Sequence, residues 1–185
     1  MLRIITTLFA FFMAMSVAAE ELRVPLQGRD DLVINLPAGW QGQIRRARPD
    51  VPPTIAITGS PAGSLQVLIT PIWPSGSGKG STPDELRGLV RGAADQVRSQ
   101  AVERDIEIRE LGAPGKTGYF FSVTDRQPEP GGYKYMTQGT MGLDELRITF
   151  TVLVNGDPKA PRATALELLR TLRRTPPGAD GKSRV

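Results

Sequence analysis

Reactive chemistry in this chain has to come from carboxylates, serines, lysines and tyrosines, because its 185 residues include no histidine and no cysteine. Their absence excludes Ser-His-Asp and Cys-His catalysis and removes the imidazole and thiolate ligands that most transition-metal sites use. Paired carboxylates, a Ser-Lys dyad or a tyrosine-centred site are the remaining options. Sequence spacing brings no such set together, so we expect a protein that is not an enzyme and has no cofactor.

An acidic stretch comes nearest to a cation site. Glu103, Asp105 and Glu107 alternate along the chain, and an extended backbone would place Asp105 and Glu107 on one face. Carboxylate oxygens are ligands for hard cations. The same pattern is typical of a strand face turned toward water, and we favour that interpretation, with no metal.

A glycine-rich loop follows Trp73. It contains Ser77, Lys79 and Ser81, but nothing near Lys79 in the sequence would bury it and lower its pKa. The run Gly78-Lys79-Gly80-Ser81 also lacks the spacing of a phosphate-binding Walker A loop. We therefore expect a plain connector.

Binding surfaces use aromatic and arginine side chains around a shaped patch. The proline-stiffened hairpin from Asp125 to Tyr135 is the richest candidate, and it offers Arg126, Glu129, Tyr133, Lys134 and Tyr135. Trp40 and Trp73 lie in turns and are further candidates. The alternative is structural: either tryptophan would then plug the core, and the tyrosines would be ordinary sheet residues under a helix.

A helix near the middle of the chain must position these segments. Thr82 is a good N-cap, Pro83 suits the first helical position, and Glu85 completes a capping box. Apolar residues then recur on one stripe, at Leu86, Leu89, Val90, Ala93, Val97 and Ala101. The pattern predicts an amphipathic helix that runs to about Glu103 and covers a sheet.

Strand patterns flank this helix on both sides. The sequence predicts strands at 22–27, 32–36, 43–47, 54–58, 65–72, 105–111, 119–124, 133–141 and 146–154. A second helix is predicted from Pro161, with its end at Thr175-Pro176-Pro177. We expect an α+β fold with a single antiparallel β-sheet flanked by two main helices, in an αβα sandwich.

The first nineteen residues have the pattern of a secretory signal peptide. Arg3 precedes an apolar run from Ile4 to Val17, and Val17-Ala18-Ala19 offers a cleavage site after Ala19. The run is short for a spanning helix, so we expect no stable membrane anchor after cleavage. The expected organisation is a signal peptide over 1–19, one α+β domain over 20–174 and a disordered tail over 175–185, in the periplasm.

The formal charge of +4 is small and reflects 23 basic against 19 acidic residues. The arginines are spread along the chain, whereas nucleic-acid binding uses a dense basic stripe and a recognisable module. We expect no nucleic-acid partner. Solubility explains the charge, and an anionic partner is the alternative.

The order of elements, with the turn Pro37-Ala38-Gly39-Trp40 after an early strand, resembles the PsbP/Mog1-like group, including DcrB-type secreted bacterial proteins. The resemblance implies an antiparallel sheet sandwiched between helices. It also implies a non-catalytic accessory or adaptor role, since members mostly act in this way. Photosynthetic members assist metal-containing complexes, but no such site can be matched to residues here.

Three functions follow as hypotheses. The first is a periplasmic, non-catalytic accessory or adaptor protein that binds another envelope protein. The alternative is a periplasmic carrier of a small or anionic ligand, in a pocket between sheet and helix with arginine as counter-charge. The third is an enzyme that uses carboxylates. The sequence does not specify an oligomeric state.

Overall fold

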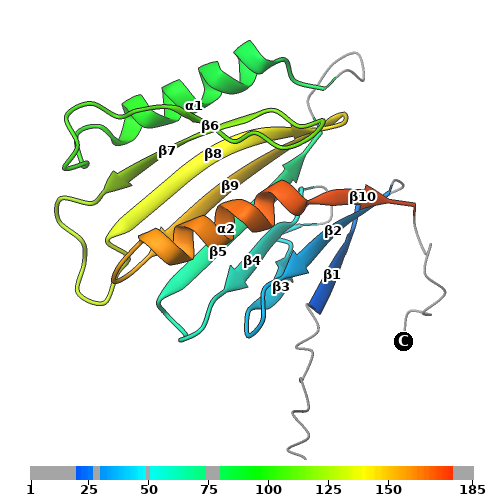
Figure 1. Cartoon of the computed structure of the whole chain (residues 1–185), viewed down its shortest axis with the longest axis horizontal. Helices are drawn as coiled ribbons and strands as arrows, with labels where there is room; N and C mark the ends of the chain where they lie inside the picture. Colours follow the sequence, from blue (N-terminus) through cyan, green and yellow to red (C-terminus); the bar gives the residue numbers. More distant parts are fainter. Residues whose placement is uncertain (1–19, 27–29, 49–50, 74–79, 177–185) are drawn as a thin grey trace, which may run out of the picture.

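A seven-stranded antiparallel sheet forms the centre of the molecule (Figure 1). The computed structural model describes residues 20–26, 30–48, 51–73 and 80–176. In sheet order the strands are β3 (Gln41–Arg45), β4 (Thr54–Thr58), β5 (Leu65–Ile72), β9 (Leu146–Val154), β8 (Tyr135–Leu143), β7 (Gly118–Thr124) and β6 (Arg109–Glu110). β5 and β9 therefore lie side by side near the middle of the sheet, although α1 and three strands separate them in the sequence.

A second sheet contradicts the prediction of a single sheet flanked by two helices. It has three strands, in the order β1 (Glu20–Pro25), β2 (Asp31–Leu36) and β10 (Arg173–Thr175). Alternation of apolar residues shows that a segment is a strand but does not reveal its partner, so β1 and β2 could not be separated from the larger sheet. β10 was missed because its arginines fit the end of a helix equally well.

The helix α1 (Pro83–Val97) begins where the sequence predicts. The Thr82 amide donates to Glu85 Oε2 at 2.8 Å, and the Glu85 amide donates to Thr82 Oγ1 at 3.3 Å, so the capping box is confirmed. The helix ends at Val97 rather than near Glu103. Ala101 instead forms an isolated bridge with Asp125 and is buried there, which explains why it continued the apolar stripe.

The two helices lie on opposite faces of the large sheet (Figure 1). α1 packs on β7 and β8, whereas α2 (Lys159–Thr171) packs on β9 and on β2 of the second sheet. α2 begins two residues before the predicted Pro161. The layers are therefore α1, the large sheet, and then α2 together with the small sheet.

The core is divided by the large sheet. The main core lies on the α2 side, where Ile148, Phe150 and Val152 of β9 are buried against α2 and the small sheet. A smaller core lies under α1, around Phe121 and Val123 of β7. Because α1 covers only β7 and β8, the α1-side face of β9 and β5 is only partly covered.

The predicted strand 105–111 is shorter in the structure, where only Arg109–Glu110 pairs with β7. Thr175, which was placed in the disordered tail, belongs to β10. Several predicted features lie outside the described residues. They are the predicted signal peptide, the turn at 27–29, the loop at 74–79 and the tail from 177 onward. None of the described helices is both long and apolar enough to cross a membrane.

Candidate functional site

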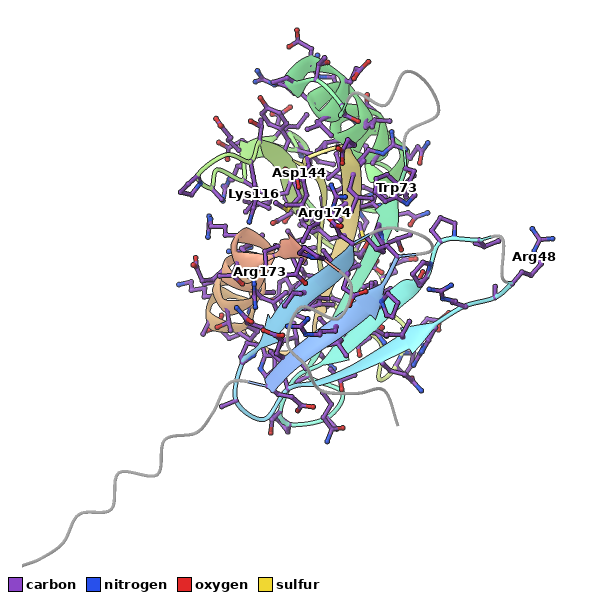
Figure 2. All side chains as sticks on the ribbon, turned by 90° about the vertical axis from the view of Figure 1, so that its right-hand side faces the viewer. Arg48, Trp73, Lys116, Asp144, Arg173 and Arg174 are labelled. Carbon is purple, nitrogen blue, oxygen red and sulfur yellow. The ribbon has the colours of Figure 1, made fainter. Side chains whose placement is uncertain are left out.

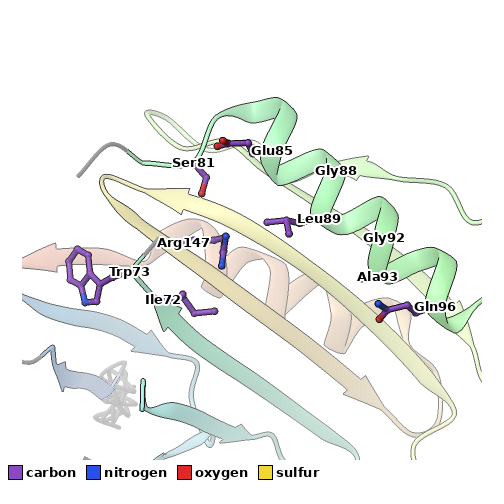
Figure 3. Close-up of a pocket in the computed structure, with 10 residues that line it drawn as sticks. All are labelled: Ile72, Trp73, Ser81, Glu85, Gly88, Leu89, Gly92, Ala93, Gln96 and Arg147. Atoms are coloured by element: carbon purple, nitrogen blue, oxygen red, sulfur yellow. The ribbon is translucent and has the colours of Figure 1, made fainter. Parts of the chain in front are cut away.

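A groove of about 790 Å³ lies beside α1, on the partly covered face of the large sheet (Figure 3). We call it the α1 groove. Its lining consists of Ile72, Trp73, Ser81, Glu85, Gly88, Leu89, Gly92, Ala93, Gln96 and Arg147. One wall is thus a face of α1, and the other comes from the ends of β5 and β9.

Two glycines, Gly88 and Gly92, leave the α1 wall of the groove without side chains at these positions. A Cβ atom built on Gly88 or Gly92 would meet no heavy atom within 4 Å, so packing does not require a glycine at either position. Glycine in a helix interior costs roughly 1 kcal/mol relative to alanine. Leu89 lies between them and is 47% exposed, which is unusual for a large apolar side chain. Together they leave an open strip with an apolar side chain in it.

Arg147 supplies the only basic side chain among the described residues that line the groove. β9 places it between Ile72 of β5 and Gly142 of β8, on the α1 side of the sheet. Its Nε atom is shielded from solvent and has no hydrogen-bond partner among the described residues. No carboxylate in the described ranges forms an ion pair with it. Figure 3 shows Arg147 and Leu89 on opposite walls of the groove.

A smaller cavity of about 190 Å³ adjoins the groove and shares Leu89, Ala93 and Arg147 with it. The rest of its lining is Val90, Phe121, Gln138, Gly139, Thr140 and Thr149. Both threonine hydroxyls are already used, since Thr140 Oγ1 donates to the Ile148 carbonyl and Thr149 Oγ1 to the Thr70 carbonyl. The cavity therefore presents mainly apolar atoms, with Arg147 at its junction with the groove.

Arg174 of β10 holds Trp73 at one end of the groove. Its guanidinium lies 5.5 Å from the centroid of the Trp73 ring and forms ion pairs with Asp30, Asp144 and Glu145 (Figure 2). The Arg174 side chain is only 13% exposed. Three segments that are distant in the sequence thus meet at the Arg174 guanidinium. Sequence analysis missed Arg174 because it assigned this residue to the end of the second helix.

Lys116 lies near the same end of the molecule (Figure 2). Its ammonium donates to the carbonyl oxygens of Arg170, at 2.7 Å, and of Leu172, so it caps the last turn of α2. Burial lowers the pKa of Lys116, and the nearby Asp144 carboxylate only partly opposes that shift. Its hydrogen bonds are structural, and it does not line the groove.

The hairpin predicted to bind a partner combines exposed charges with two half-buried tyrosines. The exposed Arg126 side chain donates to the Ala101 carbonyl at 2.7 Å and so holds the chain after α1. Tyr135 is partly buried against the main core, with the Lys134 ammonium 5.7 Å from its ring centroid. Tyr133 is half-buried, and Glu129 and Lys134 are exposed. Partner binding by this hairpin stays a prediction.

The two tryptophans have different positions. Trp40 is partly buried against the main core, as expected for a residue that closes one end of it, and its amide completes the predicted turn by donating to the Pro37 carbonyl at 3.0 Å. Trp73 also packs against the core but lines the α1 groove. Only Trp73 is therefore brought together with the unpaired Arg147.

The acidic stretch lines a separate cavity of about 280 Å³, together with Arg109 and Arg162. Burial raises the pKa of Glu103, but hydrogen bonds from the amide and hydroxyl of Thr124 outweigh it and hold the pKa below its usual value. Glu107 pairs with Arg109 at 2.7 Å. Among the described residues no three acids are placed to hold a metal ion.

Sequence analysis did not select Arg147, Leu89, Gly88 or Gly92 as site residues. Arg147 alternates with apolar residues along β9 and so looked like an ordinary solvent-facing residue. The available signals were two glycines, Gly88 and Gly92, four residues apart on one face of a well-capped helix.

No known family profile matches the chain, and no curated protein matches its sequence. A search of solved structures found the solution structure of cyanobacterial PsbP (CyanoP) from Synechocystis sp. PCC 6803. It superposes with a TM-score of 0.50 at 14% identity, over 88% of this chain and 96% of that one. The resemblance to DcrB-type proteins stays a prediction. Together with the two-sheet topology, the superposition confirms that this chain has a PsbP-like α+β fold.

Proposed function

We propose that this protein is a non-catalytic carrier that binds an anionic ligand in the α1 groove. The observation that supports this function best is the unpaired, half-buried Arg147 in the groove wall. Its Nε atom is shielded from water without an acceptor, and burying a polar N–H group without a hydrogen bond is costly. A carboxylate or phosphate oxygen on a ligand would supply the missing acceptor.

The other polar groups of the groove support binding rather than catalysis. The Glu85 carboxylate is engaged in the capping box, so it is not positioned as a general base. Ser81 and Gln96 lie near opposite ends of the helix wall, and apart from the engaged Glu85 the described lining residues place no base beside Ser81. The signal-peptide pattern of residues 1–19 supports the proposal that this carrier acts in the periplasm.

Replacing Arg147 with glutamine is expected to weaken anion binding at least tenfold, since a charge-assisted hydrogen bond contributes about 1.5–3 kcal/mol. The measurement is thermal shift followed by calorimetric titration, with acetate, inorganic phosphate, glucuronate and decanoate as probes. The matched control is Arg91→Gln, which removes an exposed arginine of α1 that does not line the groove. Absence of any stabilising anion, or equal responses of both variants, would contradict the proposal.

An adaptor that binds another envelope protein is the second candidate. The exposed, proline-stiffened loop around Glu129, with Lys134 beside it, favours this function. Because Tyr135 packs against the core, the test uses the exposed charges. The double variant Glu129→Lys/Lys134→Glu is expected to abolish capture of a partner cross-linked in the periplasm, while the melting temperature stays within 2 °C or so. Retained capture of the same partner by the variant would remove the hairpin from this hypothesis.

A further inference from the structure

We infer that the ligand is a single-chain anionic amphiphile, with its headgroup at Arg147 and its hydrocarbon chain along the α1 groove. This inference rests on the proposed function and adds the chemical class of the ligand. It depends on the shape of the groove, on the distribution of polar atoms in it, and on the strands that form its floor.

The groove follows the length of α1. Its helix wall consists of Glu85, Gly88, Leu89, Gly92, Ala93 and Gln96, which recur at the spacing of one helix face. From Glu85 to Gln96 the helix advances by eleven steps of the usual rise, which is about 16 Å. The smaller cavity branches from this strip at Leu89 and Arg147. An extended chain fits such a shape better than a compact ring or an inorganic ion does.

The middle of the helix wall is apolar, whereas polar side chains lie toward its two ends. Between Glu85 and Gln96 the helix wall presents only glycine, alanine and Leu89, and Ile72 faces it from β5. Arg147 lies opposite Leu89 in this middle part, and its Nε atom has no acceptor among the described residues (Figure 3). An anion attached to a hydrocarbon chain would satisfy Arg147 and cover Leu89, which neither a free anion nor an uncharged sugar would do.

The floor excludes a peptide bound as an added strand. β5 is paired with β4 and β9, and β9 is paired with β5 and β8, so the backbone groups of both strands are already used. An extended peptide gains affinity from the free backbone groups of a sheet edge. The α1 groove lies on the face of central strands, where only side chains are available.

The first experiment titrates the purified protein with three probes and follows binding by calorimetry. Dodecanoate below its micellar concentration carries both the headgroup and the chain, acetate carries only the headgroup, and submicellar dodecyl maltoside carries the chain without charge. We expect dodecanoate to bind at least tenfold more tightly than either of the others. Arg147→Gln should reduce dodecanoate binding to the level of the neutral detergent.

A groove-filling variant tests the position of the chain. Gly92→Leu should weaken dodecanoate binding at least tenfold and leave acetate binding unchanged, and Gly88→Leu is a second variant with the same expectation. Both positions have open space for a side chain, and circular dichroism verifies folding. Ala163→Leu places the same side chain on an exposed position of α2 and should change neither affinity.

The outcomes separate this inference from the proposed function. Equal affinities for acetate and dodecanoate, both dependent on Arg147, would overturn the amphiphile and leave an anion carrier. Dodecanoate binding that survives Arg147→Gln and both leucine variants would show adsorption elsewhere and overturn the inference. If Arg147→Gln changed the affinity for none of the anions, both the amphiphile inference and the proposed anion carrier would be overturned.

Discussion

Gly139→Ala is expected to lower the free energy of unfolding by about 3 kcal/mol, which corresponds to a fall in melting temperature of roughly 6–12 °C. A Cβ atom at this position in β8 would lie 2.3 Å from the Tyr119 carbonyl oxygen, 2.5 Å from Phe150 Cζ and 2.7 Å from Phe120 Cβ. The first contact is with backbone of the paired strand β7, which can move only by disturbing the ladder. Alanine therefore has no low-energy arrangement here.

The matched control is Gly142→Ala in the same strand. Its nearest contacts would be the Leu86 methyl group and the Thr117 carbonyl oxygen, both at 3.8 Å, which is ordinary packing distance. We expect a change of less than about 1 kcal/mol there. Urea unfolding followed by circular dichroism measures both variants. Similar midpoints for the two alanines would show that β7 and β8 are not packed as closely as described.

Arg174→Met should lower the free energy of unfolding by about 2–3 kcal/mol, because it leaves three carboxylates from two distant segments without their shared cation. Asp30 precedes β2, whereas Asp144 and Glu145 form the turn between β8 and β9. Methionine keeps much of the hydrophobic contact but removes the charge and the cation–π contact with Trp73. The small sheet, the large sheet and one end of the groove are all joined at this residue.

Arg173→Met is the control for position and charge. Arg173 lies on the same strand and pairs with Glu21, but its side chain is 42% exposed, so we expect a loss of no more than about 1 kcal/mol. Arg174→Lys should fall between the two methionine variants, because lysine keeps the charge but not the planar fork. Equal losses from Arg173→Met and Arg174→Met would contradict a central role for Arg174.

Local elements were largely predictable. The start of α1 depends on hydrogen bonds between residues three apart, and the capping box identifies it without knowledge of the rest of the chain. β9 was equally clear because one of its faces is buried along its whole length. The predicted end of α1 was wrong. Ala101 continues the apolar stripe because it packs against β7, not because it belongs to the helix.

The candidate site was less predictable, and Arg147 shows why. Its position on the polar face of β9 follows from the alternation of the strand. Its Nε atom has no acceptor among the described residues because α1 covers only part of that face, and this cannot be read from the sequence. Arg126 in the hairpin shows the same limit. Its side chain is exposed, and only the structure shows that one guanidinium nitrogen donates to the Ala101 carbonyl, twenty-five residues earlier.

The sequence by itself determined the elements, the absence of histidine and cysteine chemistry, and the signal-peptide pattern, because these depend on residue types and on neighbours within one or two helical turns. Only the tertiary structure decided that β2 pairs with both β1 and β10 in a separate sheet, that Arg174 meets three carboxylates, and that Arg147 meets none in the part of the chain that the structure describes. The physical reason is that strand pairing and ion pairing depend on which distant segments are brought together. Residues far apart in the chain become neighbours only when the sheets and helices pack.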